Sequence, residues 1–376
     1  MMAAAPWPHA RLDAVGSVVT GGTPPTSDRS NYGRQHLFVS PADLGRTKYV
    51  RTSAKMLSTK GFAGSRRVPA GSTLFVCIGS TIGKVGLAGE DLATNQQINS
   101  IIPNGSVDPE FLFYATSTLS AIVREQAGEQ AVPLVNKSQF SEFEIPMPPL
   151  VEQKEIATAL ADADDLIATL ERLIAKKQAI KQGMMQQLLT GRTRLPGFTG
   201  EWTDSRLGDV LTVRHGRNQR IVEIPSGTVP ILATGGQIGW ADRPLYSKPS
   251  VLIGRKGTID RPQYQDRPFW TVDTLFYTEI STKADPRFLY YVFQTIDWRS
   301  MNEASGVPSL SSTRIESVEV RLPDLAEQKA VRRVLDDADV ETTVLRARLA
   351  KARAVKQGMM QQLLTGCTRL QVEAVS

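Results

Sequence analysis

The stretch KQGMMQQLLTG occupies Lys181–Gly191 and returns letter for letter at Lys356–Gly366. Without a gap, the match extends from Pro148–Leu195 to Pro323–Leu370, with 27 identical residues in 48 positions. Agreement over this length indicates that one structural element has been duplicated. Such a repeat has to be recognised before any other pattern in the chain is interpreted.

Each copy is predicted to form one long helix. Apolar or small residues recur mainly at steps of three and four, which is the spacing of a heptad seam. Pro148-Pro149 and Pro323 block extension upstream, and Gly191 and Gly366 stand where a left-handed C-terminal cap belongs. A helix of roughly 39 residues is about 58 Å long and must bury its apolar stripe on a partner, for which the other copy is the nearest candidate. The expected stripe comprises Ile156, Leu160, Ala163, Ile167, Leu170, Ile174, Ile180, Met184 and Leu188 in the first copy, and Val331, Leu335, Ala338, Thr342, Leu345, Leu349, Ala352, Val355, Met359 and Leu363 in the second.

Both predicted helices contain a glycine in their interior, at Gly183 and Gly358. A glycine at such a position costs about 1 kcal/mol relative to alanine. Its presence in both copies indicates that another segment approaches the backbone closely or that the helix bends there. Simple tolerance of a glycine is the third interpretation.

Weaker similarity precedes each copy and extends the repeat over most of the chain. The corresponding pieces are separated by 175 to 195 residues, so the two preceding regions share a plan but differ in loop length. The chain therefore consists of two related globular regions, each followed by one copy of the helix. The matching pieces are Trp7 and Trp202, Asp108–Tyr114 and Asp285–Tyr291, and Val132-Pro133 and Val307-Pro308.

Each globular region is predicted to be an α+β domain. Short β-rich runs bounded by Gly and Pro, such as Thr73–Ile78 and Val251–Ile253, indicate strands. Asp108-Pro109 and Asp285-Pro286 are typical of a helix N-cap followed by proline at the first helical position. The expected boundaries are 1–149 for the first domain, 150–195 for the central helix, 196–323 for the second domain, 324–370 for the distal helix and 371–376 for a tail.

Composition excludes several classes of protein. Of the 376 residues, 41% are hydrophobic and 22% charged, the balance of a folded protein with a core. No apolar stretch is long enough to cross a membrane, and the first residues lack the pattern of a secretory signal. Two cysteines far apart and three histidines argue against a disulfide framework and against a metal centre. These features predict a cytoplasmic protein without a metal.

Positive charge is concentrated in two regions. Residues 29–67 contain nine Lys or Arg and one acid, and residues 206–261 contain nine Lys or Arg and four acids. The whole chain has a net charge of only +6, so the clustering says more than the total. Two separate basic regions are typical of two docking places for a polyanion. An ordinary solvated surface is the alternative interpretation.

The sequence nominates no catalytic site. Gly79–Lys84 resembles a phosphate-binding loop but has three residues between its glycines instead of four, and Val85 follows the lysine. Pro323-Asp324 with Glu327-Gln-Lys329 has the letters of a nuclease site, yet the first copy lacks the aspartate. An acidic helix N-terminus explains both copies better. The carboxylates of Asp162, Asp164 and Asp165 are interpreted as a solvated helix face.

Binding to a DNA duplex is the chemistry that remains. Arg and Lys match the edge of guanine, Asn and Gln match adenine, and hydroxyls and amides hold phosphates. Segments rich in these residues lie in both globular regions, and an ordinary polar turn is the alternative for each one. The arginines and lysines among them could contact bases or phosphates. The candidate DNA-binding residues are Arg46, Lys48, Arg66, Arg67, Ser80, Thr81, Lys84, Asn95, Gln96, Gln97 and Asn99 in the first region, and Arg217, Asn218, Arg220, Arg255, Lys256 and Thr258 in the second.

These features together resemble the specificity subunit of type I restriction–modification systems. The resemblance covers nearly the whole chain and is strongest in the repeated helix and in the second domain. The matching segments are Gly21–Pro24, Phe38–Leu44 and Gly83–Gly86 in the first domain, and Thr234–Gly236, Gly254–Asp260 and Pro268–Tyr277 in the second.

The resemblance implies a fold and a mechanism. Each α+β domain would be a target recognition domain that reads one half of a bipartite DNA site. The two helices would pack as an antiparallel coiled coil, giving a pseudo-twofold molecule in which they set the spacing and dock methyltransferase subunits. The expected partners are double-stranded DNA, two methyltransferase subunits and two restriction or translocase subunits, with no membrane. No cofactor would be bound by this chain; S-adenosylmethionine, ATP and Mg would belong to the partner subunits.

Two other classes of protein stay open. A self-contained nuclease or methyltransferase is disfavoured because its catalytic motifs are missing. A coiled-coil adaptor that binds only protein would not need basic, loop-rich domains. Salt-dependent binding to a defined duplex distinguishes a DNA reader from such an adaptor, because phosphate contacts make affinity fall steeply with salt.

Overall fold

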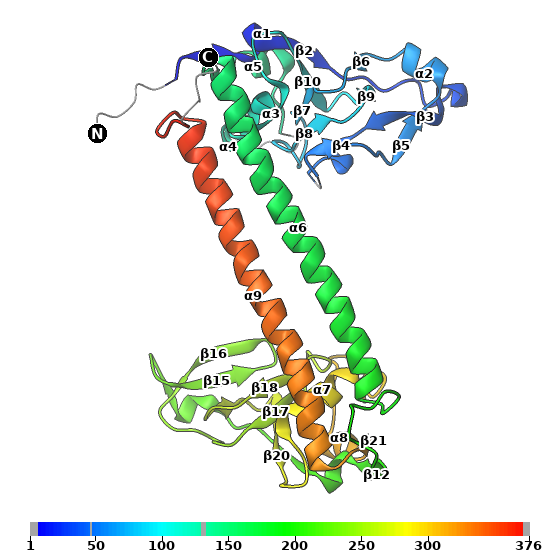
Figure 1. Cartoon of the computed structure of the whole chain (residues 1–376), viewed down its shortest axis with the longest axis vertical. Coiled ribbons are helices and arrows are strands. Elements are labelled where there is room, and N and C mark those ends of the chain that lie inside the picture. Colours follow the sequence, from blue (N-terminus) through cyan, green and yellow to red (C-terminus); the bar gives the residue numbers. More distant parts are fainter. Residues whose placement is uncertain (1–6, 46, 129–132, 371–376) are drawn as a thin grey trace. The chain divides into compact units, whose positions relative to one another are not determined.

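The computed structural model of the chain describes residues 7–45, 47–128 and 133–370 (Figure 1). They form two compact units. The first comprises Met1–Thr169 and Leu349–Ser376, and the second comprises Leu170–Arg348. Each unit thus contains one α+β domain together with parts of both long helices.

The domain of the first unit is built on two sheets and a short ribbon. A five-stranded sheet has the order β2-β10-β7-β8-β4, a four-stranded sheet has the order β5-β3-β9-β6, and β1 pairs with β11. The strands are β1 (His9–Arg11), β2 (Gly16–Thr20), β3 (Tyr32–Val39), β4 (Tyr49–Val50), β5 (Lys55–Leu57), β6 (Arg67–Val68), β7 (Thr73–Val76), β8 (Val85–Ala88), β9 (Leu92–Thr94), β10 (Ile98–Pro103) and β11 (Glu144–Pro146). The helices are α1 (Leu12–Val15), α2 (Thr59–Ala63), α3 (Pro109–Ser117), α4 (Ser120–Gln126) and α5 (Lys137–Ser141), with short 3₁₀ turns η1 (Arg29–Asn31) and η2 (Pro41–Asp43).

The domain of the second unit repeats this plan. Its sheets have the orders β13-β20-β17-β18 and β14-β16-β15-β19, and β12 pairs with β21. The strands are β12 (Thr203–Arg206), β13 (Leu211–Arg214), β14 (Glu223–Ile224), β15 (Val229–Ala233), β16 (Gly236–Ala241), β17 (Ser250–Gly254), β18 (Gln263–Gln265), β19 (Trp270–Thr271), β20 (Leu275–Ile280) and β21 (Glu319–Leu322). The helices are α7 (Pro286–Thr295) and α8 (Ser312–Glu316), with 3₁₀ turns η3 (Leu207–Asp209) and η4 (Gln219–Ile221).

Four strands of the main sheet correspond between the two domains, and β4 of the first domain has no counterpart in the second. In the first, β10 pairs antiparallel with both β2 and β7, and in the second β20 pairs antiparallel with both β13 and β17. The predicted helix starts are confirmed, because the carboxylates of Asp108 and Asp285 cap α3 and α7 with proline at the first position. The connection after β3 differs from the connection after β15. Each of these strands pairs parallel with a strand of its own domain, β3 with β9 and β15 with β19. Residues 40–54 connect β3 to β5, whereas β15 reaches β16 through the two-residue turn Thr234–Gly235.

The long helices are α6 (Leu150–Leu188) and α9 (Leu325–Leu363), as the repeat predicts. In the first unit, the start of α6 and the end of α9 share one core with α3, through residues such as Leu160 and Leu363. In the second unit, the end of α6 and the start of α9 share a core with α7, through residues such as Met185 and Leu335. Within each unit, higher residue numbers on one helix meet lower numbers on the other, so the paired segments run antiparallel.

The predicted apolar stripe is wrong in one place. Ile180 and Val355 are exposed, and the next residues, Lys181 and Lys356, turn inward instead. The steps of three and four continue without a break through Ile174, Lys177, Lys181 and Met184, and through Ala352, Lys356 and Met359. The lysine therefore occupies the seam position, and its apolar neighbour does not. Asp339 and Asp164 on the facing helices then bind these lysines at 2.5 Å.

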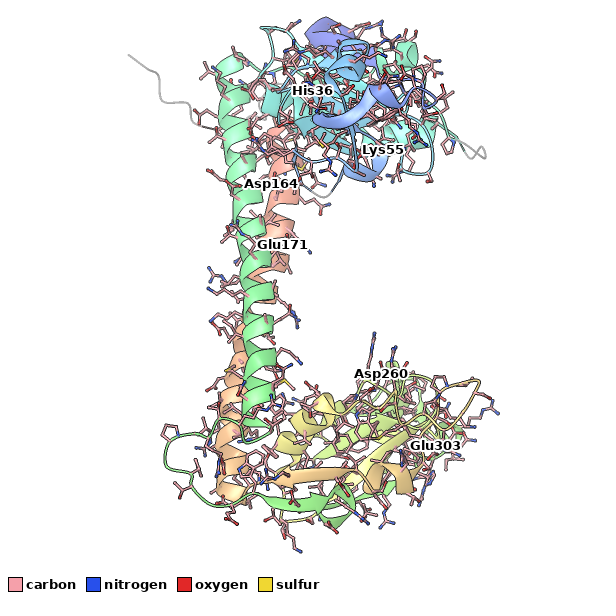
Figure 2. All side chains as sticks on the ribbon, turned by 90° about the vertical axis from the view of Figure 1, so that its right-hand side faces the viewer. His36, Lys55, Asp164, Glu171, Asp260 and Glu303 are labelled. Carbon is pink, nitrogen blue, oxygen red and sulfur yellow. The ribbon has the colours of Figure 1, made fainter. Side chains whose placement is uncertain are left out.

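Each unit contains the same clasp of tyrosine, aspartate and lysine. In the first unit, Asp164 of α6, labelled in Figure 2, accepts from the Tyr114 hydroxyl of α3 at 2.7 Å. Lys356 of α9 binds the same carboxylate. In the second, the Tyr291 hydroxyl lies 2.7 Å from the carboxylate of Asp336 and 2.8 Å from that of Asp339, and Lys181 binds Asp339. Burial and the carboxylate raise the pKa of both tyrosines, which keeps their hydroxyls protonated as donors. The interpretation of Asp164 as a solvated residue is therefore wrong.

A buried glutamine joins each domain to the first turn of its helix. Gln153 is 1% exposed; its Oε1 accepts from the backbone of Asp108 at 2.8 Å, and its Nε2 donates to Pro148 O at 2.9 Å. Gln328 makes the equivalent bonds to Asp285 and Pro323, both at 2.9 Å. These side chains fix the loop that leads into α3 or α7 against the start of α6 or α9.

The two interior glycines predict a gain in stability on substitution. A Cβ added at Gly183 or Gly358 would meet nothing within 4 Å, so close approach of another segment does not explain them. We expect Gly183→Ala and Gly358→Ala each to raise the free energy of unfolding by about 1 kcal/mol, because alanine loses less backbone entropy in a helix. Urea denaturation of the two variants checks this. A loss of stability would show that the helix needs glycine there.

Candidate nucleic-acid interface

Three loops meet at one end of the main sheet of the first domain. Because β2 and β7 both run antiparallel to β10, the segments that follow β2 and β7 meet the segment that precedes β10. The backbone NH of Gly22 donates to Thr94 O at 2.9 Å. A side chain at Gly21 would place its Cβ 2.2 Å from the carbonyl oxygen of Asn95, so only glycine allows the loops to cross this closely.

The loop after β7 contacts the segment that precedes β10 and the segment around Pro133. Gly79 has a φ of +94°, a conformation that favours glycine, and its NH donates to Pro133 O at 2.9 Å. The amide of Gln97 donates to Ile78 O at 3.4 Å, and the hydroxyl of Thr23 donates to Gln96 at 2.6 Å. Side chains of all three loops are thereby tied together.

The second domain repeats the same crossing with different side chains. A Cβ at Gly216 would lie 2.0 Å from Val272 O, and the NH of Arg217 donates to Thr271 O at 2.8 Å. Gly257 has a φ of +87° and donates to Pro308 O at 2.9 Å, as Gly79 does to Pro133. We call these sites the loop crossings, formed by residues 21–23, 77–84 and 95–97 in the first domain and by residues 216–220, 254–258 and 271–274 in the second.

In each domain, an arginine contacts the loop that contains Gly79 or Gly257, or the residues directly after it. Arg124 of α4 donates to Ile82 O at 3.3 Å in the first domain. In the second, Arg299 binds the Asp260 carboxylate at 2.6 Å and holds the pKa of that carboxyl below its usual value (Figure 2). The loops that carry the candidate residues are therefore supported from the segment that follows α3 or α7.

The loop crossings bring most of the predicted DNA-binding residues together. Asn99 is the exception within its segment, because it lies in β10, is 3% exposed and accepts from the Thr20 hydroxyl at 2.7 Å. Arg255 is half-buried. Its backbone NH donates to Thr274 O, and its guanidinium donates to Asp273 O at 3.4 Å. The exposed residues at the crossings are Ser80, Gln96, Arg217, Asn218, Arg220 and Lys256. Thr81, Lys84, Asn95, Gln97 and Thr258 are partly exposed.

The predicted residues of the basic segment 29–67 are dispersed. Arg66 reaches the first loop crossing, where its guanidinium donates to Thr20 O at 2.6 Å. Arg67 pairs with Asp91 instead. Arg46 lies outside the described residues.

Lys48 belongs to a separate cluster beside α3. Its side chain is 13% exposed and binds Glu110 at 2.9 Å and the Tyr114 hydroxyl at 3.2 Å. Burial and the hydrogen bond to Glu110 raise the pKa of Tyr49 to about 12. Although burial opposes it, hydrogen bonds from Tyr49 and Lys48 lower the pKa of Glu110. The ammonium of Lys48 thus supports α3 and its clasp with α6.

Sequence reasoning missed one residue of the first loop crossing and a hairpin tip beside the second. Thr23 was not a candidate, although its hydroxyl orients Gln96. The tip of the β15–β16 hairpin was not a candidate either, yet Gln263 holds its Ala233 carbonyl at 3.0 Å next to the loop 254–258. The Thr-Gly-Gly run between two β-rich segments is a hairpin signal that could have indicated it.

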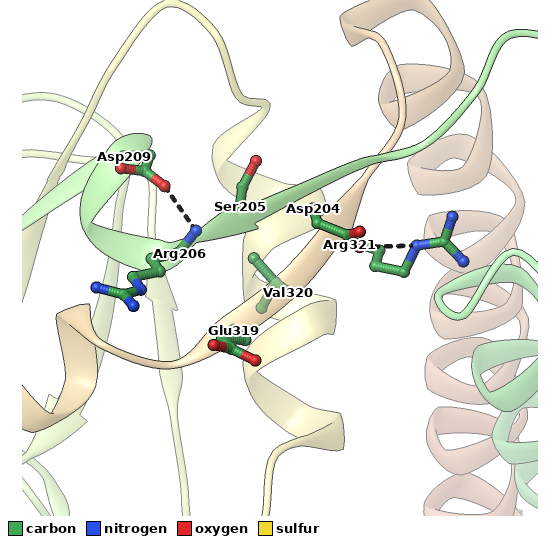
Figure 3. Close-up of a pocket in the computed structure, with 7 residues that line it drawn as sticks. All are labelled: Asp204, Ser205, Arg206, Asp209, Glu319, Val320 and Arg321. Atoms are coloured by element: carbon green, nitrogen blue, oxygen red, sulfur yellow. Dashed lines mark hydrogen bonds and ion pairs between the residues drawn. The ribbon is translucent and has the colours of Figure 1, made fainter.

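A surface hollow beside β12 and β21 contains charged residues without a catalytic arrangement (Figure 3). Arg321 pairs with Asp204 at 3.0 Å, and the carboxylate of Asp209 accepts from the backbone of Arg206 at 2.7 Å. These are structural contacts of a ribbon and a turn. In the part of the chain that the structure describes, no three His, Cys, Asp or Glu residues are grouped to hold a metal ion. Among the same residues, no helix is both long and apolar enough to cross a membrane.

Two similar α+β domains, each with a loop crossing, and two long repeated helices define a protein built from two repeated halves. The family model for the type I restriction modification DNA specificity domain matches residues 5–182 and 199–352. The chain belongs to this family, whose general role is recognition of DNA sequence.

Individual relatives agree with this assignment. The chain is 24% identical over 336 residues to the type I restriction enzyme MjaVIII specificity subunit of Methanocaldococcus jannaschii, covering 78% of both chains. In fold, it is similar to the S subunit of a type I restriction–modification system from M. genitalium, with a TM-score of 0.66 and 17% identity over 95% of this chain and 96% of the other. A chain from work on complex assembly and conformational transition of the type I R-M system has a TM-score of 0.62 and 18% identity over 98% and 100%.

Proposed function

We propose that each α+β domain reads one half of a bipartite DNA site through its loop crossing. The observation that carries this proposal is the duplication of the crossing itself. Gly21 and Gly216 make the same close approach, and Gly79 and Gly257 make the same bond to a proline carbonyl, while the exposed side chains around them differ. A preserved frame with divergent polar side chains is what two readers of different base sequences require.

The two long helices, in this proposal, set the spacing between the half-sites and dock the methyltransferase subunits. The antiparallel clasps support the first role, because they fix the register of α6 against α9 in each unit. Exposed aliphatic side chains support the second role, because a helix that is buried on one side only can offer its other side to a partner. They are Leu166, Ile180, Val340, Val344 and Val355.

Membership of the family supports our proposal for the remaining partners. The proposed assembly contains double-stranded DNA, two methyltransferase subunits and two restriction or translocase subunits, and it works in the cytoplasm without a membrane. We propose that this chain is the non-catalytic subunit and binds no cofactor itself. S-adenosylmethionine, ATP and Mg would then belong to the partner subunits.

Substitution of Arg255 tests the proposal. Arg255→Ala should weaken specific binding by about 1–3 kcal/mol and relax one half-site only, because its guanidinium is held at the second loop crossing. The measurement is methylome sequencing of a host that carries the variant. Arg321→Ala removes the same charge from β21 of the same domain and is the control. Full methylation of the original motif by the Arg255 variant would contradict the assignment.

A further inference from the structure

The β15–β16 hairpin ends in a free two-stranded ribbon. In the described part of the second domain, β15 pairs with β19 through Ile231 and Leu232, and β16 pairs with β14 through Trp240 and Ala241. Beyond these pairs, the two strands pair with no other strand up to the turn at Thr234–Gly235. A Cβ at Gly235 or Gly236 would meet nothing within 4 Å, so the tip is open.

A β-bulge in this ribbon exposes two neighbouring side chains. Ile231 lies opposite Gly239 and Leu232 opposite Gln237, so Ile238 is the extra residue of β16. In a regular strand, neighbouring side chains point to opposite faces, whereas a bulge re-aims one of them. Gln237 and Ile238 are accordingly both exposed, and the isoleucine has 53% of its surface open. A large aliphatic side chain in this position has no partner in the core clusters of the domain.

The tip lies beside the second loop crossing. The amide of Gln263 in β18 donates to the carbonyl oxygens of Ala233 at 3.0 Å and Thr234 at 3.4 Å. A Cβ at Gly257 would lie 3.9 Å from the Thr234 hydroxyl. Residues 229–241 contain no charged side chain, so the ribbon itself carries no carboxylate that would repel phosphates.

An amide next to an aliphatic group matches one base pair in particular. The major groove is about 12 Å wide and admits a two-stranded ribbon. There, an A·T pair presents N7 and the N6 amino group of adenine beside O4 and the 5-methyl group of thymine. The Gln237 Nε2 donates one hydrogen to Gly239 O at 3.2 Å and keeps a second, while its Oε1 can accept from N6. Ile238 supplies an apolar surface for the methyl group.

We propose that Gln237 and Ile238 read an A·T base pair in the major groove, the amide on adenine and the isoleucine on the thymine methyl. This inference rests on the proposed function and assigns it two specificity residues in the second domain. It makes a chemical prediction, because deoxyuridine differs from thymidine only by that methyl group.

The test uses the full chain and duplexes of the motif found by methylome sequencing, with the half-site of the second domain identified by Arg255→Ala. Thymidine in that half-site is replaced by deoxyuridine, one position at a time, and affinity is measured by fluorescence anisotropy. At one position, we expect the wild type to bind about fourfold more weakly, the factor that one buried methyl group contributes. Ile238→Ala should bind both duplexes equally. Gln237→Ala should lose about tenfold in affinity for the thymidine duplex.

Ile122→Ala is the matched control, since Ile122 is an isoleucine of α4 in the first domain with 54% of its surface exposed. It should keep the fourfold discrimination. Three outcomes would overturn the inference and leave the proposed function intact. They are a half-site without an A·T pair, a wild type that binds every deoxyuridine duplex as tightly as the thymidine duplex, and a preference for thymidine that persists in Ile238→Ala. Absence of any sequence-specific binding by the wild type would overturn both.

Discussion

Gln153→Leu should lower the free energy of unfolding of the first unit by about 3 kcal/mol, and Gln328→Leu should do the same to the second. Leucine fills a similar volume but forms no hydrogen bond. The backbone NH of Asp108 or Asp285 and the carbonyl of Pro148 or Pro323 then lose their partner. Both glutamines are nearly fully buried, so water cannot replace these bonds without opening the junction.

Calorimetry of the full chain measures this effect. Because two units need not unfold together, each variant is expected to shift the transition of its own unit. Gln178→Leu is the matched control, since Gln178 is an exposed residue of α6 and its replacement should change little. Unfolding temperatures of Gln153→Leu and Gln328→Leu equal to that of the control would show that the two glutamines do not hold the domains to their helices.

The same junction shows why part of the fold could be predicted from the sequence and part could not. The bounds of α6 and α9 follow from local signals, namely prolines upstream, glycines downstream and an apolar stripe between. Lys181 and Lys356 lie on the heptad seam, but a charged side chain is stable there only where an acid of the facing helix lies opposite. That register is a tertiary property, and the repeated aspartates at 164 and 339 were the signal for it.

The candidate interface shows a similar division. Residue types alone pointed to Gln96, Arg217 and Lys256, and the structure exposes all three at a loop crossing. The same criterion chose Asn99 and Lys48, which lie in a buried strand and in an ion pair with Glu110. Exposure of a polar residue is decided by the sheet that carries it, and this information is absent from a count of polar residues.

Exchange of the first domain should change one half of the recognised DNA site completely and leave the other half as it is. In the chimaera, residues 1–149 come from a relative with a different target, and the rest of the chain is kept. The loop crossings are formed within single domains, so each half-site should travel with its own domain. The relative must keep the tyrosine of α3, because its hydroxyl donates to Asp164 of α6.

The reciprocal exchange of residues 196–323 is the control for this experiment. It should replace the half-site that the first exchange leaves unchanged. Both chimaeras keep α6 and α9 and the lysine–aspartate pairs between them, so the number of base pairs between the half-sites should stay constant. A changed spacing in either chimaera would show that the domains, and not the helices, determine it.

Methylome sequencing of a host that carries the 1–149 chimaera tests the central claim most directly. Two similar domains that read separate half-sites predict a motif with one half from the relative, one half from the original protein and an unchanged spacer. A motif altered in both halves, or one identical to the original, would contradict the claim that each domain recognises its own half-site.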